Sequence, residues 1–145
     1  MKTHEELRRL SNSCIQRADV MKKARVAWEE LAIEGLGETP TELMSSAAEI
    51  TVERLQRFSD DMEPWFRTRL YEQAVTCFVE AGRFRDALAV SWAWETESPS
   101  EYRAACELHG TSWNFLKSSG YLRWRNKYAQ THTVPKYLPL PEFRR

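Results

Sequence analysis

The chain has 145 residues, of which 42% are hydrophobic and 29% charged, and its formal net charge is zero. A chain of this size can bury a core without metal or disulfides, and the isolated cysteines Cys14, Cys77 and Cys106 indicate free thiols rather than a disulfide framework. No apolar run approaches the roughly 20 residues of a membrane span, and no apolar signal segment begins the sequence. We therefore expect an intracellular protein of a reducing compartment, in the cytoplasm or, as the alternative, in mitochondria.

The charge is unevenly distributed along the chain. Residues 1–26 carry seven Lys or Arg and three acidic residues, whereas residues 27–65 carry two and ten. Residues 111–145 carry seven basic residues and one acidic residue. Basic ends and an acidic middle predict surfaces that complement each other within one fold or assembly, or a field that steers a partner.

Helix start signals recur along the sequence. "TPTE" (39–42) and "SPSE" (98–101) each combine a hydroxyl N-cap, a proline at the first helical position and a glutamate that closes a capping box. "THEE" (3–6) has the same design without the proline. Because no stretch shows sustained strand-like alternation, these signals predict an all-α fold.

The first helix is predicted to run from residue 4 to about residue 34, with one apolar stripe and a length of about 45 Å. Since this is long for a domain of this size, we expect part of its stripe to face another chain. Further helices are predicted over residues 40–58, 64–81, 84–94, 99–109, 112–119 and 121–129. The predicted architecture is one bundle or hairpin array of six or seven helices over residues 1–129, followed by an extended tail over 130–145.

The segment "YEQAVTCFVEAGRFRDAL" (71–88) resembles the core of a tetratricopeptide repeat around a turn glycine, Gly82. The motif's large and small positions match at Tyr71, Phe78, Phe84 and Ala87. This resemblance covers about one repeat and implies two closely packed antiparallel helices. A shift of 34 residues reveals no second copy, so it implies a repeat-like hairpin and no peptide-binding groove.

The segment "AACELHGTSWNFLKSS" (104–119) resembles a helix-turn-helix with Gly110 at its turn. The resemblance implies a second helix that would face DNA through Trp113, Asn114 and Lys117. Downstream, "YLRWRNKY" offers further basic residues between aromatic ones, which could contact phosphates and stack on bases: Arg123, Arg125 and Lys127. The alternative, which we favour, is a packed helix with snorkelling basic side chains.

Metal and catalytic motifs are sparse. Cys106 and His109 form half of a zinc site, without a second pair at suitable spacing. The sequence contains no nucleophile elbow, phosphate-binding glycine loop or zinc-protease motif. We therefore expect no cofactor, no metal and no enzymatic activity.

Aromatic residues suggest where partners bind. Trp92 and Trp94 are two residues apart on a predicted helix and point to different faces, so we expect one of them at an interface. The tail has three prolines that favour extended backbone, and apolar residues that favour docking. These tail residues are Tyr137, Leu138, Leu140 and Phe143.

The sequence favours a non-enzymatic adaptor or accessory subunit of a larger protein assembly, which binds partners through its long helix and its tail. An inhibitor that docks on its target would share these features. The alternative is a small nucleic-acid-binding regulator that uses residues 112–128.

Overall fold

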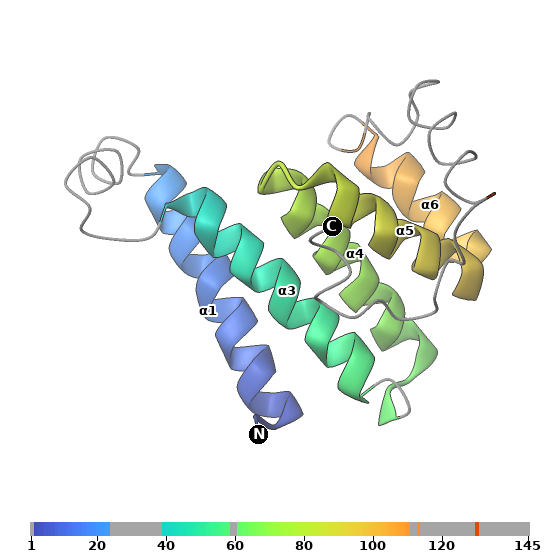
Figure 1. Ribbon diagram of the computed structural model, residues 1–145, viewed down its shortest axis with the longest axis horizontal. Helices are drawn as coiled ribbons and strands as arrows, with labels where there is room; N and C mark the ends of the chain where they lie inside the picture. Colours follow the sequence, from blue (N-terminus) through green and yellow to red (C-terminus); the bar gives the residue numbers. More distant parts are fainter. Residues whose placement is uncertain (1, 24–38, 59–60, 111–112, 114–129, 131–145) are drawn as a thin grey trace.

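The computed structural model describes residues 2–23, 39–58, 61–110, 113 and 130 (Figure 1). Its helices are α1 (His4–Lys23), α3 (Pro40–Phe58), α4 (Pro64–Glu80), α5 (Phe84–Glu97) and α6 (Pro99–His109). These described residues include no strand, which confirms the all-α class. The predicted continuation of the first helix to residue 34, the helices over 112–119 and 121–129, and the tail over 131–145 lie outside them. No helix within the described ranges is long and apolar enough to cross a membrane.

The helix boundaries follow the start signals closely. α3 and α6 begin and end at the predicted residues, α4 ends one residue earlier, and α5 extends to Glu97. The backbone N–H groups of Glu6 and Glu42 donate to the Thr3 and Thr39 hydroxyl oxygens at 3.1 and 3.2 Å, as the capping motifs predict.

The predicted side-chain cap at Ser98 is wrong. Ser98 is the only residue between α5 and α6, so it ends one helix and begins the next. Its backbone N–H donates to the Trp94 carbonyl oxygen at 2.7 Å, and its side chain makes no capping hydrogen bond to α6. The connection is therefore too short for Ser98 to adopt the geometry of a free N-cap.

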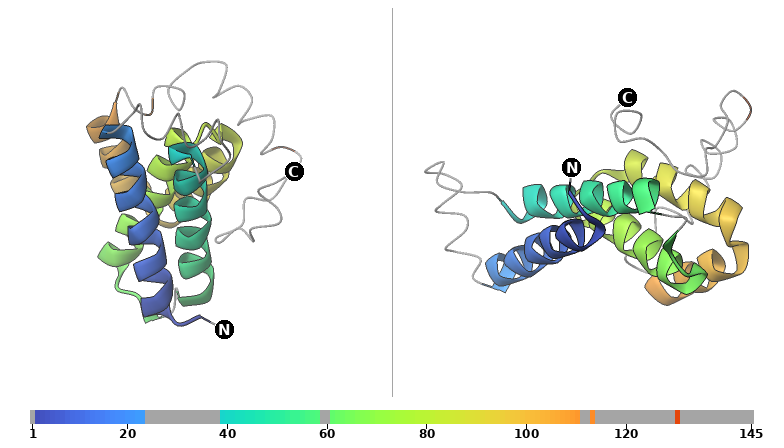
Figure 2. Two further views of the ribbon diagram at one scale, coloured as in Figure 1. Left: turned by 90° about the vertical axis from the view of Figure 1, so that its left-hand side faces the viewer. Right: turned by 90° about the horizontal axis from the view of Figure 1, so that it is seen from below.

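The helices form an array in which each packs against its neighbour in the chain (Figure 1). α1 and α4 lie on either side of α3, and α5 continues the array toward α6. The view from below shows that the array is bent rather than flat (Figure 2). Because α1 and α4 pack on α3 and scarcely on each other, a space remains between them.

The core lies where α3, α4 and α5 meet. Small residues with no exposed surface, Ala47, Ala74 and Ala87, allow the helix backbones to approach closely. Gly82, in the turn between α4 and α5, has a φ of 73°, a left-handed conformation that glycine adopts without strain. The Phe78 side chain beside this turn is fully buried.

Aromatic rings join α4, α5 and α6. The Trp94 ring lies parallel to the Tyr71 ring with centroids 6.0 Å apart. It also meets Tyr102 edge-on at 5.3 Å and Trp113 edge-on at 6.1 Å. Contacts of this kind stabilise a core beyond the burial of their area.

Trp92 and Trp94 are both buried, with 3% and 0% of their surface exposed. The prediction that one of them lies at an interface with a partner stays a prediction, although neither side chain is exposed in this chain. α5 packs against α4 and also against α6, so different faces of this helix are covered. Neither indole lies on the surface of the described structure.

Candidate functional site

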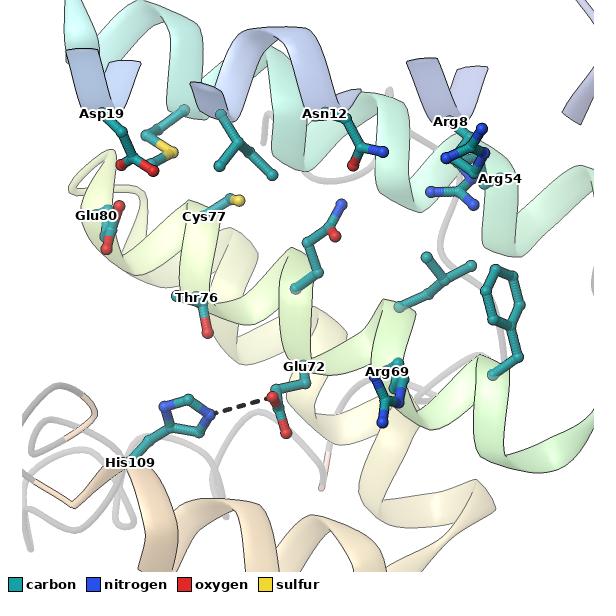
Figure 3. Close-up of a pocket in the computed structure, with 15 residues that line it drawn as sticks. Arg8, Asn12, Asp19, Arg54, Arg69, Glu72, Thr76, Cys77, Glu80 and His109 are labelled. Atoms are coloured by element: carbon teal, nitrogen blue, oxygen red, sulfur yellow. Dashed lines mark ion pairs between the residues drawn. The ribbon is translucent and has the colours of Figure 1, made fainter. Parts of the chain in front are cut away.

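A groove runs between α1 and α4, with α3 as its floor (Figure 3). It has a volume of about 540 Å³ and is open to solvent. The α1 wall consists of residues three or four apart, which lie on one helical face: Arg8, Asn12, Ile15 and Asp19. α3 contributes Met44 and Arg54, and the facing side of α4 forms the opposite wall from Phe66 to Glu80.

Arg54 is the most unusual residue of this groove because it is a cation with only 2% of its surface exposed. Its Nη2 lies 3.2 Å from His4 Nε2, and its guanidinium carbon lies 5.7 Å from the centre of the Phe66 ring. Its Nε is buried and has no hydrogen-bond acceptor among the residues that the structure describes. Burial, reinforced by the nearby Arg8 charge, lowers the pKa of Arg54 from 12.5 to about 10, so the group remains charged at neutral pH.

His4 provides a neutral neighbour for this cation. Burial first, and then the Arg54 charge, lower the pKa of His4 below 6.5. The imidazole stacks on the Phe58 ring with centroids 5.0 Å apart. A neutral His4 whose Nε2 carries no proton can accept the Arg54 hydrogen bond, whereas a protonated one cannot.

Two further arginines line the same end of the groove. Arg8 lies beside Arg54 (Figure 3) and donates from Nε to the Glu5 carboxylate at 2.9 Å. This hydrogen bond holds the pKa of Glu5 below its ordinary value. The negative charge of Glu5 is therefore paired with the Arg8 guanidinium. Arg69, on α4, is exposed, and its guanidinium carbon lies 5.8 Å from the centre of the Trp65 ring. Arg8, Arg54 and Arg69 form what we call the basic end of the groove.

The opposite end of the groove is acidic and carries Asp19 and Glu80 (Figure 3). Lys22 Nζ lies 2.9 Å from Glu80 Oε2, so this pair links α1 to α4 across the space. α1 advances about 16 Å from Arg8 to Asp19, and α4 advances by the same length from Arg69 to Glu80. The groove is therefore electrostatically polarised along its length.

The middle of the groove holds polar side chains and a cysteine. Gln73 donates to the Thr51 hydroxyl at 2.8 Å, and this hydroxyl donates to the Ala47 carbonyl oxygen at 2.7 Å. Burial, with a smaller contribution from Glu80, raises the pKa of Cys77 to about 12, so it is a neutral thiol rather than a nucleophilic thiolate.

His109 lies at the α6 side of the groove, with Nε2 3.4 Å from Glu72 Oε1 (Figure 3). Its ring stacks on Trp113 with centroids 4.3 Å apart. Over the part of the chain that the structure describes, no group of three or more His, Cys, Asp or Glu could hold a metal ion.

Of the nucleic-acid residues suggested by the sequence, the structure describes Trp113 alone. Trp113 is fully buried against Trp94 and His109, so its predicted position on a DNA-facing surface is wrong. Asn114, Lys117, Arg123, Arg125 and Lys127 lie outside the described residues. The same holds for the tail residues predicted to bind partners: Tyr137, Leu138, Leu140 and Phe143.

Sequence reasoning missed the basic end. One signal was present, because Arg54 is seven residues after Ala47 and so lies on the apolar face of its helix. A cation at such a position is either paired inside the fold or lines a cavity. Arg8 and Arg69 carry no comparable signal, since charged residues on exposed helix faces are common.

The fold and groove define an all-helical protein with an open, charge-polarised space between two helices that share a third. Comparison of the chain with protein-family models, curated proteins and solved structures gives no match.

Proposed function

We propose that the protein is a non-enzymatic helical adaptor or accessory subunit, and that a segment of a partner protein binds in the groove between α1 and α4. The observation that carries this proposal is the groove itself, which follows two helices for about 16 Å and has opposite charges at its ends. Charge complementarity along such a surface fixes the orientation of a bound chain.

The shape of the groove supports a protein segment rather than a small molecule. Small-molecule sites enclose most of the ligand surface, whereas this groove is open to solvent. Its cysteine, Cys77, is held as a thiol by burial. Cys77 is therefore not an activated nucleophile at this surface.

The order of the helices also supports the proposal. α1 and α4 form the walls of the groove, α3 forms its floor, and His109 of α6 reaches it, so four of the five described helices line this space. Arrays of helical hairpins present such surfaces to extended or helical segments of other proteins.

The test is site-specific capture of partner proteins. Asn12 is half-buried in the groove wall, whereas its neighbour Ser13 is exposed and outside the groove. We expect a photo-crosslinking residue at position 12, but not at position 13, to capture defined proteins from nuclease-treated native lysate. Asn12→Trp, which fills the groove, should abolish this capture by the full-length chain, and Ser13→Trp should preserve it.

The tail and the nucleic-acid alternative are tested in the same experiment. A chain that ends at residue 129 should lose partners if residues 130–145 also dock, as their composition predicts. Equal capture by the Asn12→Trp and Ser13→Trp variants would rule out the groove as the site. Recovery of nucleic acid without protein when nuclease is omitted would favour the alternative regulator, with Asn114, Lys117, Arg123, Arg125 and Lys127 as its contacts.

A further inference from the structure

The floor of the groove holds a positive charge that the described part of the chain does not neutralise. Arg54 is almost fully buried, its Nε has no acceptor, and its hydrogen-bond neighbour is the imidazole of His4. Glu5, the carboxylate that acts on it from α1, is already hydrogen-bonded to Arg8. Burying a charge is costly unless an opposite charge and hydrogen bonds compensate for it.

The other groups around Arg54 increase this deficit. Arg69 lines the same end and adds positive charge, whereas the charge of Arg8 is paired with that of Glu5. Asp19 and Glu80 lie at the acidic end, and Glu72 lies between Arg69 and His109 (Figure 3), with its Oε1 3.4 Å from His109 Nε2. An anion that reaches Arg54 therefore meets its guanidinium group and an aromatic ring, Phe66, and no groove-wall carboxylate is hydrogen-bonded to Arg54 among the described residues.

We propose that the basic end binds one carboxylate, carried by an aspartate or glutamate side chain of the partner segment in the groove. This inference rests on the proposed function and specifies the chemistry of the partner. Guanidinium groups bind carboxylates through paired, charge-assisted hydrogen bonds. Arg54 is one buried, uncompensated cation, so one negative charge neutralises it. Arg69 is exposed and hydrated, so it does not require a second negative charge. A carboxylate, with one charge, therefore matches this site better than a phosphate monoester with two.

The direct test uses amino-acid probes and the full chain labelled with ¹⁵N. N-acetylglutamate α-amide carries one side-chain carboxylate, and N-acetylglutamine amide is its neutral counterpart. At constant ionic strength, we expect the first probe to shift the Nε–H signal of Arg54 with half-saturation on the order of 1–10 mM, and the second to cause no shift. The signal of Arg9, which is exposed outside the groove, should not respond to either probe.

Variants then assign the effect to individual arginines. We expect Arg54→Gln to weaken binding of the glutamate probe at least about tenfold, read from the Arg69 signal, and Arg69→Gln to weaken it about threefold. Arg9→Gln should leave it unchanged. The inference is overturned if Arg54 shows no saturable shift, if Arg9 responds equally, or if capped phosphoserine half-saturates the site at a lower concentration than the glutamate probe.

Failure of this inference is distinguishable from failure of the proposed function. If crosslinking at position 12 captures partners and Arg54→Gln captures them equally well, a segment binds in the groove without a carboxylate at its basic end. If position 12 captures nothing while the glutamate probe binds Arg54, the site is an anion site and the groove does not hold a partner segment, which overturns the inference in the form proposed.

Discussion

Replacing Arg54 with methionine is predicted to stabilise the fold. The fall in the pKa of Arg54 from 12.5 to about 10 corresponds to roughly 3 kcal/mol of unfavourable burial. Because the groove is open to water, solvent screening reduces this to about 1–2 kcal/mol. Arg54→Met also loses the contacts to His4 and Phe66 but fills the same space with apolar atoms. We therefore expect the free energy of unfolding to rise by about 1 kcal/mol, as when other buried charges are replaced.

Urea unfolding followed by circular dichroism measures this change. An increase of about 1 kcal/mol should raise the midpoint by roughly 0.5 M if the slope is unchanged. Arg57→Met is the matched control, since Arg57 donates to Glu53 at 3.1 Å and to the Lys2 carbonyl oxygen at 2.7 Å. This control should lower the midpoint slightly. A loss of more than about 1 kcal/mol in Arg54→Met would refute the reasoning, because it would mean that the native state already compensates the Arg54 charge.

Three further predictions concern the glycine of the α4–α5 turn, the hydrogen bonds of Arg83 beside it, and the pH dependence of stability. Gly82→Ala should cost about 1 kcal/mol of unfolding free energy by urea denaturation, because the added Cβ meets no atom within 4 Å and only the positive φ opposes it; an unchanged midpoint would contradict this. Arg83→Met should lower the thermal midpoint by roughly 5–10 °C, since Arg83 joins Asp86, Ser45 and Glu49 at 2.6–2.7 Å; the exposed Arg103→Met is its control. Because the folded pKa of His4 is below 6.5, the unfolded chain binds more protons in that range, and stability should fall as pH drops below about 6.5. The urea midpoint of His4→Gln should fall less between pH 7 and pH 5, and parallel curves would contradict the assigned role of His4.

The local features of the fold were predictable because short-range chemistry determines them. Threonine caps and prolines at the first helical position mark where α1, α3 and α4 begin, and Gly82 marks the turn between α4 and α5. The burial of both Trp92 and Trp94 was not predictable in the same way. For Trp94 it depends on the approach of α4 and α6, whose Tyr71 and Tyr102 rings pack against the indole, and no periodicity within residues 84–97 reveals this.

The groove was unpredictable for a related reason. It exists because α1 and α4 share α3 as a neighbour without packing closely on each other, and this depends on the positions of three helices. Arg8 and Arg54, which are 46 positions apart in the sequence, belong to helix faces whose relation only the assembled array defines. Arg54 was the exception, since a charge on an apolar helix face is visible in the sequence itself.

Arg54 connects the stability of the array to its proposed binding activity. An apolar side chain at this position would bury its surface without desolvating a charge, so the arginine is suboptimal for folding alone. It is well placed for binding, because a carboxylate entering the basic end meets a guanidinium already held by His4 and Phe66. Arg54→Met should therefore separate the two properties, with a higher urea midpoint and no saturable response of Arg69 to the glutamate probe. A variant that gained stability and still bound the probe would show that Arg8 and Arg69 suffice, and that the buried charge has no role in recognition.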